Sequence, residues 1–353
     1  MNADLPRVSV IVVNWNRADL TQQAIDSLTA QVSRFPLTIV VVDNGSDDGS
    51  ADALAAANPS LDIVRRPTNG GFAAGVNAGI ASTSSEFVVL MNNDAVAEPD
   101  FVENIVGMLH SSSDDVAAAT GRILLTGTWS AIDEQEAAPA TSDAAPLLTA
   151  RNGAQWRPSN DGVVLTNSTG NTLDRSGNGG DRSWLAPHPA PASDDVFGFS
   201  GGAVALRRAS LEAVGVFDES LFMYYEDTEL SWRLRRSGHR IVFAGDAVVH
   251  HRHAGSSGTQ STLFIRANAR NRIAVAIMHG TARMAISGAG RTLYRVARTG
   301  LDRRVSSTER AAVRTALADV AGSLPRLVRL RRQFDRSATV SRHDIVERYI
   351  GRD

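Results

Sequence analysis

Three apolar, β-branched segments of this sequence are each followed at once by side chains that can bind a ligand. The groups are Asn14-Trp15-Asn16, Asp43-Asn44 and Asn92-Asn93-Asp94. In an open α/β sheet, ligands bind outside the carboxyl ends of the strands. Asn and Asp also favour ordinary turns, so one such group alone carries little weight. Three groups on one edge of one sheet predict a polar, acidic crevice that holds a ligand.

The phosphate-binding motifs that would identify this ligand are absent. No Gly-x-Gly-x-x-Gly follows the first apolar segment, which disfavours a dinucleotide-dependent oxidoreductase. The glycines in residues 70–75 are not followed by Lys and Ser or Thr, which disfavours a P-loop. Because few basic residues surround the predicted crevice, we expect a divalent cation to neutralise a bound phosphate. Oxygen ligands such as the Asp94 carboxylate suit Mg²⁺ or Mn²⁺.

A second acidic cluster, residues 226–229 (Glu-Asp-Thr-Glu), begins a predicted helix. Acidic residues in a first turn complement the helix dipole, which is the simplest interpretation. Asp227 also lies three residues before Leu230, on the face expected to be buried. Glu229 and Arg233, four residues apart, are expected to pair on another face. Desolvation raises the pKa of an inward-facing carboxylate, so Asp227 is a candidate general base.

Three histidines, His250, His251 and His253, lie just beyond a strand predicted over residues 247–249. A single histidine is more often structural than a metal ligand. Three within four positions, downstream of an acidic cluster, leave the metal-binding and the structural interpretations equally open.

A regular alternation of strand-like and helix-like segments over the first 110 residues positions these side chains. Apolar runs predict strands over residues 8–13, 38–42, 61–64 and 87–91, and helical spacing predicts helices near 20–28, 50–57, 72–81 and from Pro99. This alternation with short connections predicts an α/β fold with right-handed βαβ units, in which helices flank a mostly parallel sheet.

The second half of the chain is less regular. Residues 126–195 are rich in Ala, Pro, Ser, Asn and Gly, and predict long inserted loops with one short strand near 163–165. Beyond them the pattern predicts helices over 207–214 and 226–237, strands over 241–243 and 247–249, and a helical region from 262 that is interrupted by Gly280, Gly288, Gly290 and Gly300. We therefore divide the chain into a catalytic-type domain over residues 1–265 and a helical C-terminal region over 266–353.

Length and composition limit the class of protein. With 353 residues, 43% of them hydrophobic, the chain can bury a large core. It contains no cysteine, which excludes disulfides, thiolate nucleophiles and cysteine metal sites. It begins without a basic segment before an apolar one, and it has no apolar run of about 18 residues, so we expect a cytoplasmic protein.

The charge of the chain is unevenly distributed. All 36 basic residues are arginines, and residues 266–353 hold 19 of them against 7 Asp and Glu. Such an Arg-rich region could meet acidic lipid headgroups, nucleic acid, or the acidic remainder of its own chain, and it could equally be a solvated helical surface. Because no recognisable nucleic-acid-binding module accompanies it, nucleic acid is not an expected partner.

Together these residues resemble the family 2 glycosyltransferases, inverting enzymes with the GT-A fold, and most closely their bacterial rhamnosyltransferase-like branch. The resemblance covers roughly residues 7–275 and runs in order through 12–16 (VVNWN), 41–50 (VVDNGSDDGS), 69–77 (NGGFAAGVN), 91–94 (MNND), 200–202 (SGG), 217–219 (FDE) and 224–233 (YYEDTELSWR). No single segment is decisive, but the ordered set is specific.

The resemblance implies a site for a nucleotide-sugar donor. Asp43 would recognise the nucleobase, and Asn14 and Asn16 would line the same pocket. The other residues implied to contact donor or acceptor are Asn69, Asn77, Asn92, Asn93, Gly201 and Gly202.

The resemblance also implies a metal and a base. Asn92-Asn93-Asp94 falls where the family keeps its Asp-x-Asp motif, so Asp94 would bind Mg²⁺ or Mn²⁺ even though Asn92 replaces the first acid. His251 matches the family's downstream metal-ligand histidine better than His250 does. Asp227 matches the catalytic base.

The implied activity is that of a metal-dependent inverting hexosyltransferase in the synthesis of cell-envelope polysaccharide. It would move a sugar from a nucleotide-diphosphate donor, dTDP-rhamnose or a UDP-sugar, to a hydroxyl of a glycan or lipid-linked acceptor. An alternative is an inactive nucleotide-sugar-binding subunit of an assembly complex, although the presence of both Asp94 and Asp227 favours the enzyme. The C-terminal region is a candidate for peripheral contact with the inner face of the cell membrane, where lipid-linked acceptors are found.

Overall fold

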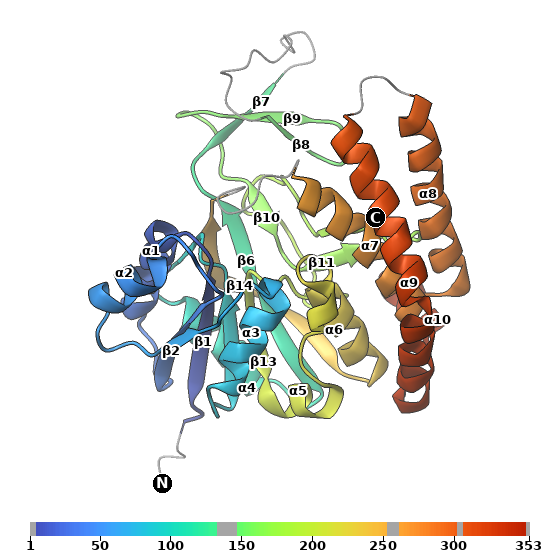
Figure 1. Cartoon of the computed structure of the whole chain (residues 1–353). Coiled ribbons are helices and arrows are strands. Elements are labelled where there is room, and N and C mark those ends of the chain that lie inside the picture. The colour runs from blue at the N-terminus through green and yellow to red at the C-terminus, as the bar shows by residue number, and fades with distance from the viewer. Residues whose placement is uncertain (1–4, 133–146, 253–260, 302–305, 351–353) are drawn as a thin grey trace.

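Nine strands form one mixed sheet, and helices cover both of its faces (Figure 1). In the order in which they lie side by side, the strands are β3 (Ile63–Arg65), β2 (Leu37–Asp43), β1 (Val8–Asn14), β4 (Phe87–Met91), β13 (Ala203–Arg207), β6 (Val116–Leu125), β14 (Arg240–His251) and β5 (Ala95–Ala97), with β10 (Thr166–Ser168) paired to β6. The computed structural model describes residues 5–132, 147–252, 261–301 and 306–350. The predicted α/β fold is confirmed.

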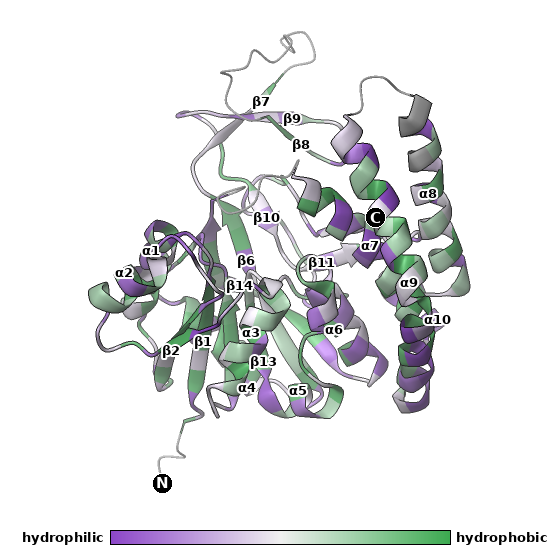
Figure 2. Cartoon of the chain, in the orientation of Figure 1, coloured by the Kyte–Doolittle hydropathy of each residue, from purple (hydrophilic) through white to green (hydrophobic). Residues whose placement is uncertain are grey.

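The alternation of side chains along β1 explains the two helical layers. The helices that flank the sheet are α1 (Ala18–Thr29), α2 (Ser50–Ala57), α3 (Gly71–Ala81), α4 (Phe101–Ser111), α5 (Arg208–Val214) and α6 (Glu226–Arg236). Val10 and Val12 pack with α1 and α4, whereas Ile11 packs on the opposite face with α3, α5 and α6. The strands are accordingly among the most hydrophobic parts of the chain in Figure 2.

The N-terminal half matches its prediction closely. Strands β3, β2, β1 and β4 are parallel neighbours, and the register places Asn14 directly beside Asp43. The carboxyl ends of these strands therefore meet at one edge of the sheet, as the alternation of strands and helices predicted.

The second half differs from its prediction in several places. Strands β5, β6 and β13 were not predicted, and the strands expected at 241–243 and 247–249 are one strand, β14, with a register shift between Ala244 and Val248. The Ala-rich start of β6 has no strand-like pattern of its own; it forms a strand because β13 and β14 pair with it on both sides.

The segment over residues 126–195 contains more regular structure than long loops, where the structure describes it. Strands β7 (Trp129–Ile132), β9 (Gln155–Pro158) and β8 (Leu148–Thr149) form a small sheet, and β11 (Asn171–Leu173) pairs with β12 (Gly179–Asp181) in a hairpin. The strand expected near 163–165 begins at Thr166 as β10. These strands are too short to give a periodic sequence signal.

The C-terminal region is helical, as predicted, and is packed onto the rest of the chain. Its helices are α7 (Thr262–Met278), α8 (Ala282–Leu301), α9 (Ser307–Ser337) and α10 (Arg342–Tyr349). Gly280 separates α7 from α8, but Gly288, Gly290 and Gly300 lie inside α8 rather than interrupting the helical region. Trp232 of α6 lies in one hydrophobic cluster with residues of α7, α9 and α10. A domain boundary at 265/266 would cut α7. In the described ranges, no helix has the length and apolar character that crossing a membrane requires.

A buried ionic network joins α6 to α7. Arg233 Nη2 lies 2.7 Å from Glu229 Oε2, and their side chains are only 6% and 1% exposed. His279 Nε2 lies 2.9 Å from the other oxygen of Glu229. Burial by itself raises the pKa of Glu229, but the Arg233 guanidinium and His279 lower it to about 2, so the carboxylate is charged. The predicted pairing of Glu229 with Arg233 is confirmed, and it is buried rather than on the surface.

Substitution of Arg233 should therefore destabilise the fold strongly. Arg233→Met leaves Glu229 buried with half of its neutralising partners and leaves the carbonyls of Val214, Gly215 and Val216 without their donor. We expect the free energy of unfolding, measured by urea denaturation, to fall by about 3–5 kcal/mol. The exposed Arg314 provides the control, because Arg314→Met should change it by less than about 0.5 kcal/mol. Equal effects of both substitutions would contradict this account of the network.

Candidate active site

Asn14 and Asp43 form a hydrogen-bonded pair at the carboxyl ends of β1 and β2. Asn14 is fully buried; its Nδ2 donates to Asp43 Oδ1 at 2.9 Å, and its Oδ1 accepts from Thr21 at 2.7 Å. Asp43, 3% exposed, also accepts from the Ser46 amide at 3.1 Å and from the Ser46 hydroxyl at 2.6 Å. Asn14 thus orients Asp43 from behind. Neither residue lines the neighbouring pocket, whose wall includes Val13 and Asn44, the chain neighbours of Asn14 and Asp43.

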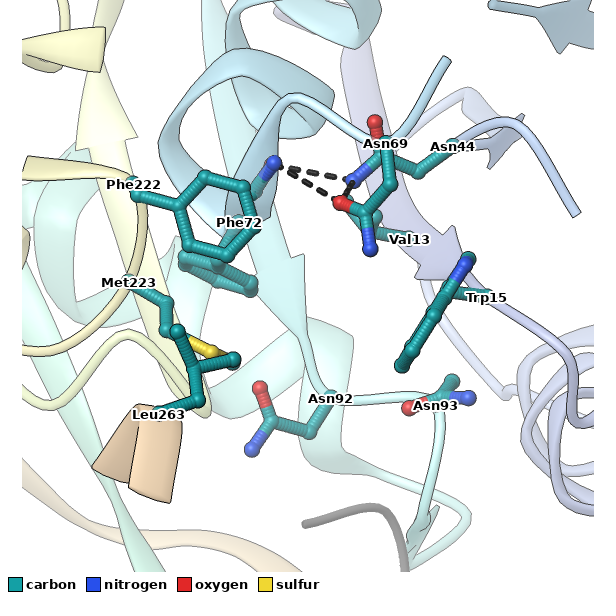
Figure 3. Close-up of a pocket in the computed structure, with 11 residues that line it drawn as sticks. Val13, Trp15, Asn44, Asn69, Phe72, Asn92, Asn93, Phe222, Met223 and Leu263 are labelled. Atoms are coloured by element: carbon teal, nitrogen blue, oxygen red, sulfur yellow. Dashed lines mark hydrogen bonds between the residues drawn. The ribbon is translucent and has the colours of Figure 1, made fainter. Parts of the chain in front are cut away.

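That pocket lies between the strand ends and the segment before α6, and has an empty volume of about 760 Å³ (Figure 3). One wall carries amides and the indole of Trp15, which is 47% exposed. The opposite wall is apolar. The lining residues are Val13, Trp15, Asn44, Asn69, Gly71, Phe72, Asn92, Asn93, Phe222, Met223 and Leu263. Flat rings beside amides suit a ligand with a planar base and polar edges.

The amides at the pocket are held by one another. Asn44 Nδ2 donates to Asn69 Oδ1 and to the Gly71 carbonyl, each at 3.0 Å, and the Gly71 amide donates to Asn69 Oδ1 at 2.8 Å. Asn93 Nδ2 donates to Thr21 at 3.2 Å. Of the residues predicted to contact the donor, Asn69, Asn92 and Asn93 line the pocket, and these hydrogen bonds orient the side chains of Asn69 and Asn93.

Gly71 allows the segment before α6 to approach the pocket. Its φ is +82°, and a Cβ here would lie 2.2 Å from the Phe222 carbonyl oxygen. Phe222, Tyr224 and Tyr225 also have positive φ, an uncommon conformation for bulky residues that concentrates at functional sites. The sharply turned segment over 222–225 links the pocket wall directly to the start of α6.

Six of the nine residues predicted to contact donor or acceptor do not line this pocket, namely Asn14, Asp43, Gly201, Gly202, Asn16 and Asn77. Asn16 Nδ2 donates to Asp47 at 2.7 Å and so braces the two loops that follow β1 and β2. Asn77 Nδ2 donates to the Phe217 carbonyl and to Glu219, each at 3.0 Å, and joins α3 to the loop before α6. Neither lines the pocket of Figure 3.

Asp94 and His251 meet beside the pocket. The antiparallel pairing of β14 with β5 sets His251 opposite Ala95, next to Asp94, and His251 Nε2 lies 3.1 Å from Asp94 Oδ1. His250, on the other side of the strand, turns away and lies 3.0 Å from Glu98. His253 lies outside the described residues.

The Asp94–His251 pair fits a divalent cation. His251 Nδ1 lies 2.8 Å from Asn167 Oδ1, an acceptor, so the ring proton is on Nδ1 and the Nε2 lone pair faces Asp94. Adjacent ligands at about 2.1 Å from an octahedral cation lie about 3 Å apart, which matches this separation. Within the described residues no group of three or more His, Asp or Glu side chains could hold a metal alone. Phosphate oxygens and water would complete the ligand set, as is usual for Mg²⁺.

Asp227 stands in the first turn of α6, beside the glycines predicted to lie near the sugar. Its Oδ2 accepts from the Gly201 amide at 3.2 Å, and its Oδ1 accepts from the Thr228 amide at 2.6 Å. Burial raises the pKa of Asp227 despite these hydrogen bonds. Gly202 abuts Asn92, since a Cβ there would lie 3.2 Å from Asn92 Nδ2. The strand β13 that begins here therefore links the pocket amides to the carboxylate on α6.

Asp181 is a residue of this site that the sequence did not indicate. In the β11–β12 hairpin it lies opposite Asn171, whose Nδ2 is 3.4 Å from Thr228 Oγ1, and directly opposed residues project to the same face. Burial, and after it the nearby Asp227 carboxylate, raises the pKa of Asp181 to about 6. The only local signal was an acid after Gly179-Gly180, within a segment predicted to be a loop.

Comparison with known proteins agrees with this geometry. Residues 9–142 match the family model for glycosyl transferase family 2. The N-acetylglucosaminyl-diphospho-decaprenol L-rhamnosyltransferase of Mycobacterium tuberculosis is 26% identical over 263 residues, which cover 70% of this chain and 77% of that protein. The pre-mycofactocin glycosyltransferase of the same organism is 25% identical over 248 residues, 70% of this chain and 43% of that protein.

Two solved structures share the fold. A crystal structure of GalNAc-T7 with UDP, GalNAc and Mn²⁺ has a TM-score of 0.62 at 14% identity and covers 98% of this chain, which spans 57% of the length of that one. The mannosyltransferase PcManGT from Pyrobaculum calidifontis, in complex with GDP-Man and Mn²⁺, has a TM-score of 0.51 at 19% identity and covers 94% of this chain and 86% of its own. The chain thus has the GT-A fold, its residues 9–142 match the model for glycosyl transferase family 2, and its relatives include a bacterial rhamnosyltransferase.

Proposed function

We propose that this chain is an inverting, metal-dependent glycosyltransferase that moves a sugar from a nucleotide-diphosphate donor to an acceptor hydroxyl. One observation carries the proposal: a partly buried carboxylate, Asp227, is held by the Gly201 amide, separately from the Asp94–His251 pair. This arrangement separates a group that can take a proton from a pair that can hold a cation. It favours an enzyme over an inactive nucleotide-sugar-binding subunit, which would need only the pocket and the cation site.

In this proposal the pocket of Figure 3 holds the donor nucleotide, with Trp15 and Phe222 against the base. Asp43, oriented by Asn14, would accept a hydrogen bond from the base, and Asn92 and Asn93 would contact the phosphates or the sugar. A divalent cation on Asp94 and His251 would neutralise the charge that develops on the departing diphosphate.

Asp227 would accept the proton of the acceptor hydroxyl as its oxygen attacks the anomeric carbon. The bond from this carbon to the diphosphate breaks while the new glycosidic bond forms on the opposite face, so the configuration inverts. The raised pKa of Asp227 suits this role, because a carboxylate that is more basic than usual is a better proton acceptor near neutral pH. Asp181, across from Asn171, would help to orient the acceptor beside Asp227.

The relatives suggest the substrates. The M. tuberculosis rhamnosyltransferase acts, by its name, on a diphospho-decaprenol carrying N-acetylglucosamine. For the present chain we propose dTDP-rhamnose or a UDP-sugar as donor, and a glycan or lipid-linked acceptor of cell-envelope polysaccharide synthesis.

Replacement of Asp227 tests the base. Asp227→Asn should retain donor binding and lower the transfer rate by about 10²-fold or more, because the variant cannot accept the proton. In the wild type, kcat/KM should fall as the pH is lowered through an apparent pKa above the usual range of Asp, since the base is protonated below it. Asp161→Asn, in an exposed loop, is the control and should leave both the rate and the pH profile unchanged. Equal rates in all three proteins would refute the role of Asp227.

The metal and the donor can be tested by ligand-dependent thermal stabilisation. UDP-, dTDP- and GDP-sugars should each be tried with Mn²⁺ or Mg²⁺ and with EDTA; the true donor should raise the Tm more when the metal is present. Asp94→Ala and His251→Ala should lose the metal-dependent part of this increase. His250→Ala is the matched control, because His250 faces Glu98 instead. If His250→Ala and His251→Ala behaved alike, the cation would not be bound by the proposed pair.

We also propose that α8 contacts an anionic membrane surface. Ile286 and Leu293 on this helix are 73% and 58% exposed, and Arg283 and Arg298 flank them on the exposed side. An exposed apolar face bordered by arginines is typical of helices that lie in a membrane interface.

This contact predicts that the full chain sediments with phosphatidylglycerol vesicles at low salt and not with phosphatidylcholine vesicles. Ile286→Asp with Leu293→Asp should weaken the binding by about tenfold or more, because both apolar groups would be replaced by anions. Unchanged sedimentation of this variant would show that α8 is not the contact.

A further inference from the structure

A second pocket, separate from the donor pocket, lies at the other end of α6, where α8 begins, α9 ends and α10 begins (Figure 1). It has an empty volume of about 1040 Å³. Arg236, nine residues after Asp227 on α6, lines it, so the pocket lies about 13 Å along the helix from the base. The ligand of this pocket is therefore not the donor diphosphate.

The charge of this pocket is strongly positive. Three guanidinium groups line it, those of Arg236, Arg331 and Arg342, against one carboxylate, that of Asp335. Asp335 pairs with Arg236 at 2.9 Å and also accepts a hydrogen bond from Arg342. Two guanidinium groups therefore share one carboxylate. In Figure 2 the elements that meet here, α10 above all, are among the most hydrophilic of the chain.

Arg236 is buried without full compensation. Its side chain is 7% exposed, and only Nη2 reaches Asp335. Its Nε and Nη1 are buried and have no hydrogen-bond partner among the described residues. Burial lowers the pKa of Arg236, and the neighbouring Arg342 lowers it further. A buried donor of positive charge that lacks an acceptor is costly, which points to an anion that completes the site.

The surrounding groups are held in place by the backbone. Arg331 Nη1 donates to the carbonyls of Ile277 and Gly280 at 2.6 and 2.9 Å, and Arg342 Nε donates to the His279 carbonyl at 3.3 Å. These contacts cap the end of α7 and fix the two guanidinium groups relative to one another. The site is therefore organised before any ligand arrives, so little conformational entropy would be lost on binding.

We propose that this arginine pocket binds a phosphate group, with Arg236, Arg331 and Arg342 as its donors. A phosphate presents several acceptor oxygens and up to two negative charges, which match the donors of clustered guanidinium groups and the excess of two positive charges. Such a group can come from a small phosphate in solution or from the headgroup of a phospholipid, and α8, whose exposed apolar face is described above, begins at this pocket. The proposal does not depend on the transferase activity.

Inorganic phosphate is the first probe, used with the full chain at constant ionic strength and in the presence of EDTA, so that no metal recruits it to the donor site. We expect a phosphate-dependent rise in the Tm of the wild type. Arg342→Gln should raise the half-saturating phosphate concentration by about tenfold or more, because one charged donor is lost. Arg332→Gln, an exposed neighbour on α9 outside the pocket, should respond like the wild type. Arg236→Gln should abolish the phosphate-dependent rise in Tm. If this variant does not fold, the comparison of Arg342→Gln with Arg332→Gln tests the proposal.

Vesicles distinguish the two sources. If the phosphate belongs to a lipid, vesicles containing phosphatidic acid should bind the wild type more tightly than Arg342→Gln, and inorganic phosphate should compete. If it is a small phosphate, the Tm response should persist while vesicle binding is the same for both proteins. The proposal is overturned if neither probe separates Arg342→Gln from Arg332→Gln, whatever the outcome of the assays of sugar transfer.

Discussion

The buried contact of Glu229 with Arg233 and His279 is the constraint on which the arrangement of this protein most depends. It lies within α6 and joins this helix to α7, so the position of Asp227, one half-turn earlier on α6, is fixed by it. Arg233 also donates to three carbonyls at the end of α5 and in the loop that follows it. A charged network in a low-dielectric interior tolerates few geometries, which makes α6 a rigid support for a reactive carboxylate.

The two halves of the proposed active site come from different parts of the chain. The first half of the sheet supplies the proposed donor pocket and Asp43, whereas α6 and β14 supply Asp227 and His251. β13 connects them, since its start touches both Asn92 and Asp227 through Gly202 and Gly201. In this arrangement the cation ligands would stabilise the leaving group, and a separate carboxylate, Asp227, would accept the proton of the nucleophile.

The Arg-rich C-terminal region is part of the same fold, and much of its charge is used within the protein. Arg326 pairs with Asp218, Arg348 with Asp195, and Arg266 with Asp319. Of the interpretations open for this region, contact with the chain's own acidic residues thus accounts for several arginines. The exposed face of α8 and the pocket around Arg236 remain available to a partner.

Local sequence patterns were sufficient for the parallel strands, for most helices, and for the position of Asp43, Asp94 and Asp227, because the apolar periodicity and the residues that end a strand depend only on near neighbours. The family resemblance, and not a local pattern, implied that Asp94 and His251 share a metal and that Asn14, Asn16 and Asn77 contact the donor, and none of these three asparagines lines the pocket. Local patterns did not reveal β6 or Asp181. These features depend on strand pairing between segments far apart in the chain, which leaves little trace in either segment alone. Which carboxylates are desolvated, and which charges share a partner, was likewise decided only when distant elements packed together.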